Sequence, residues 1–123
     1  MKTSIDCIEP YQTLDGSEIR ELLHPQHCDA VRQQSLAEAR VPPGSCTELH
    51  RHHVTEEIYH ILAGLGRMQL GDQYLELSPG DSVVIPPGTP HCIENNGAEE
   101  LRFLCCCAPA YSHEDTELLS GRT

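Results

Sequence analysis

The chain has 123 residues, and 19 acidic against 8 basic side chains give it a formal net charge of −11. This length suits one domain with one modest core, and the acidic excess argues against nucleic acid and anionic membrane surfaces as partners, because both need clustered Lys and Arg. No apolar run approaches the roughly twenty residues of a membrane span, and the start of the chain carries no basic, apolar signal segment, so we expect a cytoplasmic protein.

Short segments of alternating side chains, separated by turn residues, predict β-strands along the chain. Ser17–Leu23 alternates loosely, and Val31–Val41 predicts a second strand that ends at the turn Pro42–Gly44. Further strands are expected at Thr47–His52, Glu57–Leu62, Met68–Leu70, Gln73–Leu77, Ser82–Ile85, His91–Glu94 and Glu100–Cys107. Many short strands joined by Gly, Pro and Asn turns indicate an all-β fold. Because the chain has no internal repeat, we expect one such unit.

Two clusters of residues have the chemistry of metal ligands. Side chains alternate along a strand, so His50 and His52 should share one face, and Glu57 and Tyr59 should share a face of the next strand. His91 follows a Pro-rich turn and begins another strand. Three imidazoles and one carboxylate suit one divalent ion of manganese, iron, cobalt, nickel, copper or zinc. In a six-coordinate site, two positions would stay open for water, substrate or dioxygen.

These clusters resemble the two motifs of the cupin superfamily, G-x5-H-x-H-x4-E-x6-G and G-x5-P-x-G-x2-H-x3-N. Every specified position is filled, by Gly44, His50, His52, Glu57, Gly64, Gly80, Pro86, Gly88, His91 and Asn95. The resemblance implies a small antiparallel barrel, also called a jelly roll or double-stranded β-helix, with one metal on its axis bound by His50, His52, Glu57 and His91. The Gly, Pro and Asn positions have structural explanations in tight turns, so they support the fold alone.

The chain is therefore interpreted as a single-domain cupin barrel in three parts. Residues 1–43 supply the N-terminal strands and a dimerisation segment, residues 44–107 form the cupin core with both motifs, and residues 108–123 form a tail that packs on the barrel. A homodimer is expected, because the segment Ser4–Leu23 could add a strand to the open sheet edge of a neighbour. In the tail, Ser112–Leu119 could form one or two helical turns, and Ser120–Thr123 is expected to fray.

Candidate catalytic residues follow from the same alternation. The period that points His50 inward also points Cys46 and Glu48 inward, and Tyr59 shares the face of Glu57. Tyr59 and Glu48 are therefore candidates for a general acid and base beside a metal. Tyr59 has core packing as its alternative, and Cys46 could face the pocket or pack beneath it.

The seven cysteines are odd in number and contain no C-x2-C pair, so neither a disulfide framework nor a structural zinc site is expected. Cys105 and Cys107 should share one face of a late strand and Cys106 the other, as small buried hydrophobes. Arg67 and Arg102 are candidates to bind an anionic group of a substrate. The remaining histidines are not expected to be ligands, because His53 and His60 have the wrong parity and His24, His27 and His113 have no partner spacing and should be exposed.

Three functions remain open at this stage, since one fold hosts many chemistries. In the first, the metal is a Lewis acid in an isomerase, cyclase or lyase type of reaction on a carbonyl or carboxylate substrate. In the second, a redox-active metal binds dioxygen and the protein is a dioxygenase. In the third, the protein is a non-catalytic module that binds or senses a small molecule. The scarcity of pocket arginines weighs against a sugar phosphate.

Overall fold

The computed structural model describes residues 1–119, which lie in short strands, turns and one helical turn, η1 (Ile5–Cys7). In chain order the strands are β1 (Tyr11–Gln12), β2 (Glu18–Leu23), β3 (Ser35–Val41), β4 (His50–His52), β5 (Glu56–Ala63), β6 (Gly66–Leu70), β7 (Gln73–Leu77), β8 (Ser82–Ile85), β9 (His91–Glu94), β10 (Leu101–Ala108) and β11 (Thr116–Leu118). The expected all-β fold is confirmed.

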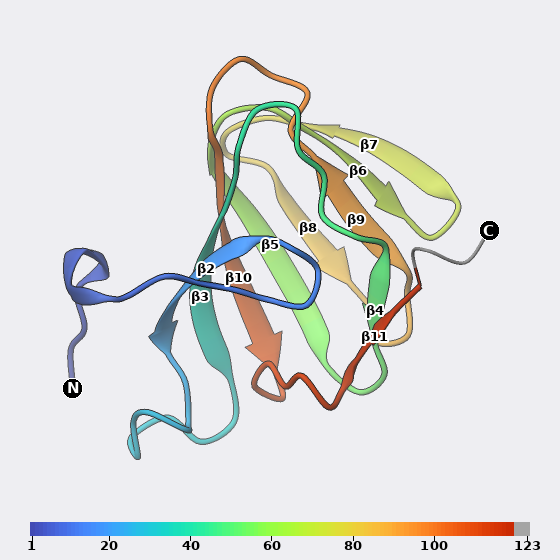
Figure 1. Ribbon diagram of the computed structural model, residues 1–123. Helices are drawn as coiled ribbons and strands as arrows, with labels where there is room; N and C mark the ends of the chain where they lie inside the picture. The colour runs from blue at the N-terminus through green and yellow to red at the C-terminus, as the bar shows by residue number, and fades with distance from the viewer. Residues whose placement is uncertain (120–123) are drawn as a thin grey trace.

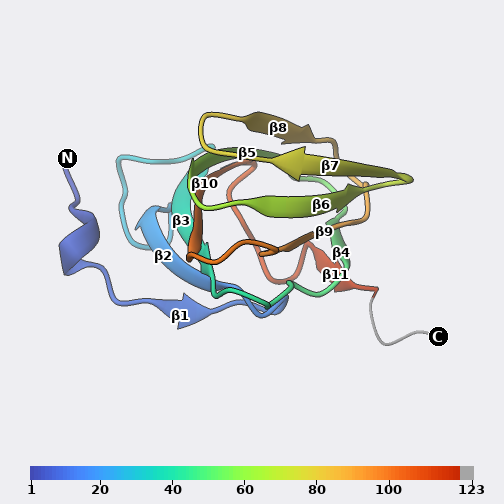
Figure 2. The same ribbon diagram turned by 90° about the horizontal axis from the view of Figure 1, so that it is seen from above.

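The strands form two antiparallel sheets that face each other and close into a flattened barrel (Figure 1, Figure 2). One sheet has the order β1-β2-β3-β10-β5-β8, and the other has the order β11-β4-β9-β6-β7. From β3 onward the chain alternates between the two sheets, except for the β6–β7 hairpin. This is the strand arrangement of a jelly roll, so the interior is lined by side chains from both sheets.

The core is formed by the inward positions of these strands. Along β5 the burial alternates, with Tyr59 and Ile61 buried between exposed neighbours, as a period of two requires. Phe103 and Leu101 on β10 and Met68 on β6 are completely or almost completely buried against them. Burial of such side chains stabilises by roughly 1.5–3 kcal/mol each. The apolar layer occupies one end of the barrel and supports the polar cluster described below.

Three of the expected elements differ in the structure. The second strand begins at Ser35 instead of Val31, and the strand expected from Thr47 is regular only from His50 to His52. The helical turns expected in the tail are wrong, because Thr116–Leu118 forms a strand that pairs with β4. Without that pairing one edge of β4 would be open, so hydrogen bonds to the sheet override the weak local helix pattern. The residues expected to fray, 120–123, lie outside the described part of the chain.

The N-terminal segment forms a hairpin of β1 and β2 that pairs with β3 of the same chain. The loop of this hairpin, residues 13–17, reaches across the end of the barrel toward β4 (Figure 1). The homodimer stays a prediction, although Glu18–Leu23, which was expected to reach a neighbour, extends the chain's own sheet. Within residues 1–119, no helix has the length and hydropathy that crossing a bilayer requires.

The bend after β5 depends on a glycine with no room for a side chain. Gly64 has a φ of +84°, and a Cβ built on it would lie 2.6 Å from the carbonyl oxygen of Glu100 and 2.8 Å from Cα of Leu101. Gly80 has a similar φ of +95°, but a Cβ there would meet open space. Comparing alanine substitutions at the two glycines therefore separates the effect of backbone strain from that of a steric clash.

We predict that Gly64→Ala lowers the free energy of unfolding by at least twice as much as Gly80→Ala. The Gly80 variant should lose about 1–2 kcal/mol, because only the left-handed backbone conformation is penalised there. The Gly64 variant must in addition displace the backbone of β10. Equilibrium denaturation in urea measures both values, and equal losses would contradict the proposed clash.

Candidate metal centre

Three histidines meet at one point inside the barrel, as the sequence predicted. His50 and His52 project inward from β4, and His91 is paired with His50 across β4 and β9. One ring nitrogen from each lies within 4.8 Å of those of the other two. All three side chains are buried, and His91 has no exposed surface. A cluster of imidazoles so close together can hold a divalent metal ion.

The orientation of each ring is fixed by an acceptor at its Nδ1 atom. The Nδ1 atom of His50 lies 2.7 Å from the carbonyl oxygen of Glu48, and that of His91 lies 3.0 Å from the carbonyl oxygen of Thr89. A carbonyl can only accept a hydrogen bond, so both Nδ1 atoms carry the proton. The neutral rings therefore present an unprotonated Nε2 to the interior, as metal-binding histidines do.

His52 is held in the same way by the tail of the chain. Its Nδ1 atom lies 3.0 Å from Oγ1 of Thr116. The Thr116 hydroxyl donates its own proton to the carbonyl oxygen of Ser112 at 2.8 Å, so it accepts from His52. The strand β11, which was expected to be helical, thus orients one of the three rings.

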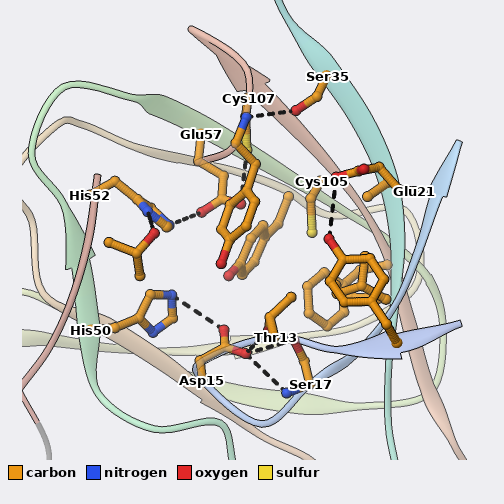
Figure 3. A pocket seen from close by; sticks show the side chains of 18 residues that line it. Thr13, Asp15, Ser17, Glu21, Ser35, His50, His52, Glu57, Cys105 and Cys107 are labelled. Carbon is orange, nitrogen blue, oxygen red and sulfur yellow. Dashed lines mark hydrogen bonds and ion pairs between the residues drawn. The ribbon is translucent and has the colours of Figure 1, made fainter. Parts of the chain in front are cut away.

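Glu57 reaches the same point from the opposite sheet. Its Oε1 atom lies 3.2 Å from Nε2 of His52 and 3.5 Å from Nε2 of His91, and Cys107 donates to its Oε2 atom at 3.3 Å (Figure 3). Burial raises the pKa of Glu57, but the imidazoles of His52 and His91 lower it further, and the result is below its usual range. Burial and the charge of Glu57 raise the pKa of the Cys107 thiol, so the thiol stays a donor.

Two buried atoms at this point have no hydrogen-bond partner among the described residues, Oε1 of Glu57 and Nε2 of His91. When the rings are neutral, a carboxylate oxygen and a ring-nitrogen lone pair face each other in a dry interior, which is unfavourable. Either a proton on the ring or a cation between the two atoms removes this conflict. Neighbouring ligands of an octahedral ion with bonds of 2.0–2.2 Å lie about 3 Å apart, and the separations from Oε1 are close to this value. The residues present therefore fit a divalent metal.

One acidic residue at the centre was missed by the sequence analysis. Asp15, in the loop between β1 and β2, places its Oδ2 atom 3.3 Å from Nε2 of His50 (Figure 3). It belongs to neither motif and lies 35 positions before His50 in the chain. Only the fold of the hairpin over the barrel end brings the two together. No local pattern in residues 11–23 could have indicated this contact.

A cavity opens from the histidines toward the N-terminal hairpin. Its empty space is about 560 Å³ when open solvent at the mouth is included, but the centre of a water-sized group can occupy only about 40 Å³ of it, which is room for a few such groups. His50, His52 and Glu57 line its polar end. Its wall is aromatic and apolar, with the rings of Tyr11, Tyr59, Phe103 and Tyr111 and the small side chains of Ala37, Ala39, Cys105 and Cys107.

Tyr59 lies on the face that its parity predicted. Its ring is 6.1 Å from that of His91 and 4.6 Å from that of Phe103, so it belongs both to the cavity wall and to the core. In the protein without metal, burial and the charge of Glu57 raise its pKa well above 10. Its hydroxyl is then protonated and can donate a hydrogen bond. A catalytic role for Tyr59 stays a prediction.

Glu48 does not face the cavity as expected, and Cys46, which could face the pocket or pack beneath it, does neither. Both side chains are exposed, and neither is among the residues that line the cavity. Thr47 points inward between them, and its Oγ1 atom accepts a hydrogen bond from the backbone of Ile93. The alternation therefore changes phase between Glu48 and the inward-facing His50, and Glu48 contributes to the cluster through its backbone carbonyl, which accepts from His50.

Some of the remaining sequence predictions are confirmed and others are wrong. Cys105 and Cys107 are buried on the cavity face and Cys106 is exposed, as alternation requires. Arg67 and Arg102 do not line the cavity. Arg67 pairs with exposed Glu76, and Arg102 pairs with the buried carboxylate of Glu38. The prediction for His24 is also wrong. It is buried, and its Nε2 atom lies 2.8 Å from the carbonyl oxygen of Tyr111.

This chain belongs to the cupin family. The family model described as the cupin domain matches residues 37–107, and this range contains both motifs. The chain is 57% identical over 119 residues to an uncharacterised protein of Methanocaldococcus jannaschii, covering 97% of this chain and 94% of the relative. It is 34% identical over 86 residues to an oxalate-binding protein of Thermotoga maritima, covering 68% of this chain and 71% of the relative.

A solved structure shows the same fold. A protein of Thermotoga maritima described as a predicted oxalate decarboxylase superposes with a TM-score of 0.78 and 28% identity, over 89% of this chain and 99% of that chain. The barrel and the position of the two motifs in it are therefore those of a small single-domain cupin.

We predict that His52→Ala protein, purified without a His tag, retains less than about one tenth of the metal of the native protein. A His53→Ala variant is the matched control, because His53 is adjacent but exposed and pairs with Glu117. It should keep native metal content. The His52 variant should also melt at a lower temperature, since metal binding adds to the stability of the folded state. Elemental analysis and thermal denaturation check both statements, and full metal occupancy in the His52 variant would contradict the site.

Proposed function

We propose that this protein is a metal-dependent cupin that binds a small molecule with a carbonyl or carboxylate group in the barrel cavity and acts on it by Lewis-acid chemistry of the isomerase, cyclase or lyase type. The observation that carries the proposal is a pair of buried atoms without a hydrogen-bond partner among the described residues, Oε1 of Glu57 and Nε2 of His91, beside a narrow cavity that Glu57 lines. An unpaired polar pair of this kind is costly unless it serves a ligand.

His50, His52, His91 and Glu57 would hold one divalent transition metal. When bound, such an ion supplies a Lewis acid that polarises a carbonyl or carboxylate oxygen. The backbone carbonyls of Glu48 and Thr89 keep two of the rings in the metal-binding tautomer. These contacts fix the donor atoms before any ligand arrives, and such preorganisation is favourable for catalysis.

The chain's own residues would bind and orient the substrate. The protonated hydroxyl of Tyr59 can donate a hydrogen bond or a proton to a substrate oxygen at the metal. The aromatic rings of Phe103 and Tyr111 line the same cavity and exclude water from it. Tyr59 thus lines the cavity and is also the candidate general acid.

The lining of the cavity restricts the class of substrate. Among the described residues that line it, none is Lys or Arg, whereas Asp15, Glu21 and Glu57 are acidic. Phosphate groups are commonly bound by Arg or Lys, so a sugar phosphate is disfavoured. A carboxylate could bind here only through the metal. The oxalate-binding relative and the solved structure at 28% identity support a small carboxylate as the ligand class.

A second candidate is a binding module without catalysis, and the exposed position of Glu48 favours it. Glu48 and Tyr59 were the two predicted acid and base groups, and of these only Tyr59 lines the cavity. Acid–base catalysis commonly uses two such groups. The dioxygenase alternative requires a redox-active metal. Finding zinc in the native protein would remove it.

The test is a calorimetric titration of the metal-loaded protein with oxalate, followed by incubation with a panel of small carboxylates and carbonyl compounds under NMR observation. We expect binding that requires the metal and chemical conversion of at least one compound. Binding without conversion would support the module. Oxalate binding to metal-free protein with equal affinity would contradict the proposed function.

We predict that Tyr59→Phe leaves metal content unchanged and weakens binding of the carboxylate about 2–10-fold, the value of one hydrogen bond. Any turnover should fall much further, since the donated proton is lost. Tyr74→Phe is the control, because Tyr74 lies on the outer surface under Arg67 and should change neither quantity. Native binding and turnover in the Tyr59 variant would mean that Tyr59 only packs in the core.

A further inference from the structure

The loop between β1 and β2 places a second carboxylate against the histidine cluster, on the side away from Glu57. Oδ2 of Asp15 lies 3.3 Å from Nε2 of His50, the ring nitrogen that faces the interior. We propose that Asp15 is a fifth protein ligand of the metal, outside both sequence motifs. This inference rests on the proposed function, because it requires that the cluster binds a metal.

The first support is the tautomer of His50. Its Nδ1 proton is donated to the carbonyl oxygen of Glu48 at 2.7 Å, so a neutral ring presents a lone pair to Asp15. A lone pair and a carboxylate oxygen repel each other. Water screens this repulsion little, because only 13% of the Asp15 side chain and 2% of the His50 side chain are exposed. The same conflict arises between Glu57 and a neutral His91 ring. A cation held by the three rings would remove it at each carboxylate that binds the ion.

The second support is the spacing of the donor atoms. The distance from Asp15 Oδ2 to His50 Nε2 is 3.3 Å, and the distance from Glu57 Oε1 to His52 Nε2 is 3.2 Å. Both are close to the roughly 3 Å between neighbouring ligands of one octahedral ion. Asp15 is thus about as close to His50 as Glu57 is to His52, whereas Glu57 also approaches His91, at 3.5 Å.

The third support is that the carboxylate is fixed in place. Its other oxygen, Oδ1, accepts hydrogen bonds from Oγ1 of Thr13 at 2.5 Å, from the backbone of Ser17 at 2.9 Å and from Oγ of Ser17 at 2.7 Å (Figure 3). These bonds saturate Oδ1 and leave Oδ2 for the cluster. The hydrogen bonds within the loop thus offset the free-energy cost of ordering an acidic side chain at the site.

The loop is also joined to the strand that carries His50. The backbone N–H of Glu48 donates to the carbonyl oxygen of Asp15 at 2.8 Å, and the carbonyl oxygen of Glu48 accepts from His50. The backbone of Glu48 therefore positions both Asp15 and His50. If Asp15 were a fifth protein ligand, a six-coordinate ion would keep one open position instead of two, so the site would favour a ligand that binds through one atom.

The experiment compares Co²⁺ affinity, measured by competition with a chromophoric chelator, and the visible absorption of bound Co²⁺ in native protein and in Asp15→Asn and Glu21→Gln variants. Glu21 is the matched control, since it lines the same cavity but pairs with His27 and Tyr11 instead of the cluster. We expect Asp15→Asn to weaken Co²⁺ binding at least about tenfold and to change the spectrum, and Glu21→Gln to do neither. Native affinity and an unchanged spectrum in Asp15→Asn would overturn the inference.

A second variant guards against a folding defect in the loop. Ser17→Ala removes one hydrogen bond to Oδ1 and leaves every donor atom in place, and we expect a smaller loss of Co²⁺ affinity in the same direction. If native protein binds Co²⁺ and both loop variants bind it equally well, the inference alone fails. If native protein binds no Co²⁺, Mn²⁺ or Zn²⁺, the proposed function fails with it.

Discussion

The structure depends on three imidazoles whose protonation is decided by their backbone and hydroxyl neighbours. Because each Nδ1 is committed to an acceptor, a neutral ring turns its unprotonated Nε2 to the interior, where Oε1 of Glu57 has no hydrogen-bond partner among the described residues. An apolar interior does not tolerate this arrangement unaided. Three such rings from one sheet, with Glu57 reaching them from the other, could hold a metal ion.

The jelly roll supplies the site through strand register. His50 and His91 are opposite each other on β4 and β9, and Glu57 is opposite Cys107 on β5 and β10. The first pair places two rings side by side in one sheet. The second pair places a thiol donor beside the glutamate in the other sheet. Since a shift of one residue would turn either pair outward, the core packing beneath the site also sets its geometry.

The sequence predicted the fold and the meeting of His50, His52 and His91 where local rules hold. Alternation placed Tyr59 correctly because β5 is long and regular. It failed at Glu48 because a single isolated bridge between Cys46 and Glu94 precedes an irregular stretch, and a period of two means nothing outside a regular strand. Asp15 could not be found for a different reason. Its place at the site is set by how the hairpin packs on the barrel, which is tertiary information.

The charge of the site determines which ligands it can accept. Glu57 alone leaves a divalent centre with a net positive charge, which would attract a carboxylate despite the acidic lining. With Asp15 also bound, two carboxylates balance the ion, and Glu21 adds a further negative charge at the cavity wall. An anionic ligand would then meet a neutral centre beside acidic residues, whereas a neutral carbonyl would meet no such repulsion. The hairpin loop would in this way select between ligand classes, although it carries no residue that the family pattern specifies.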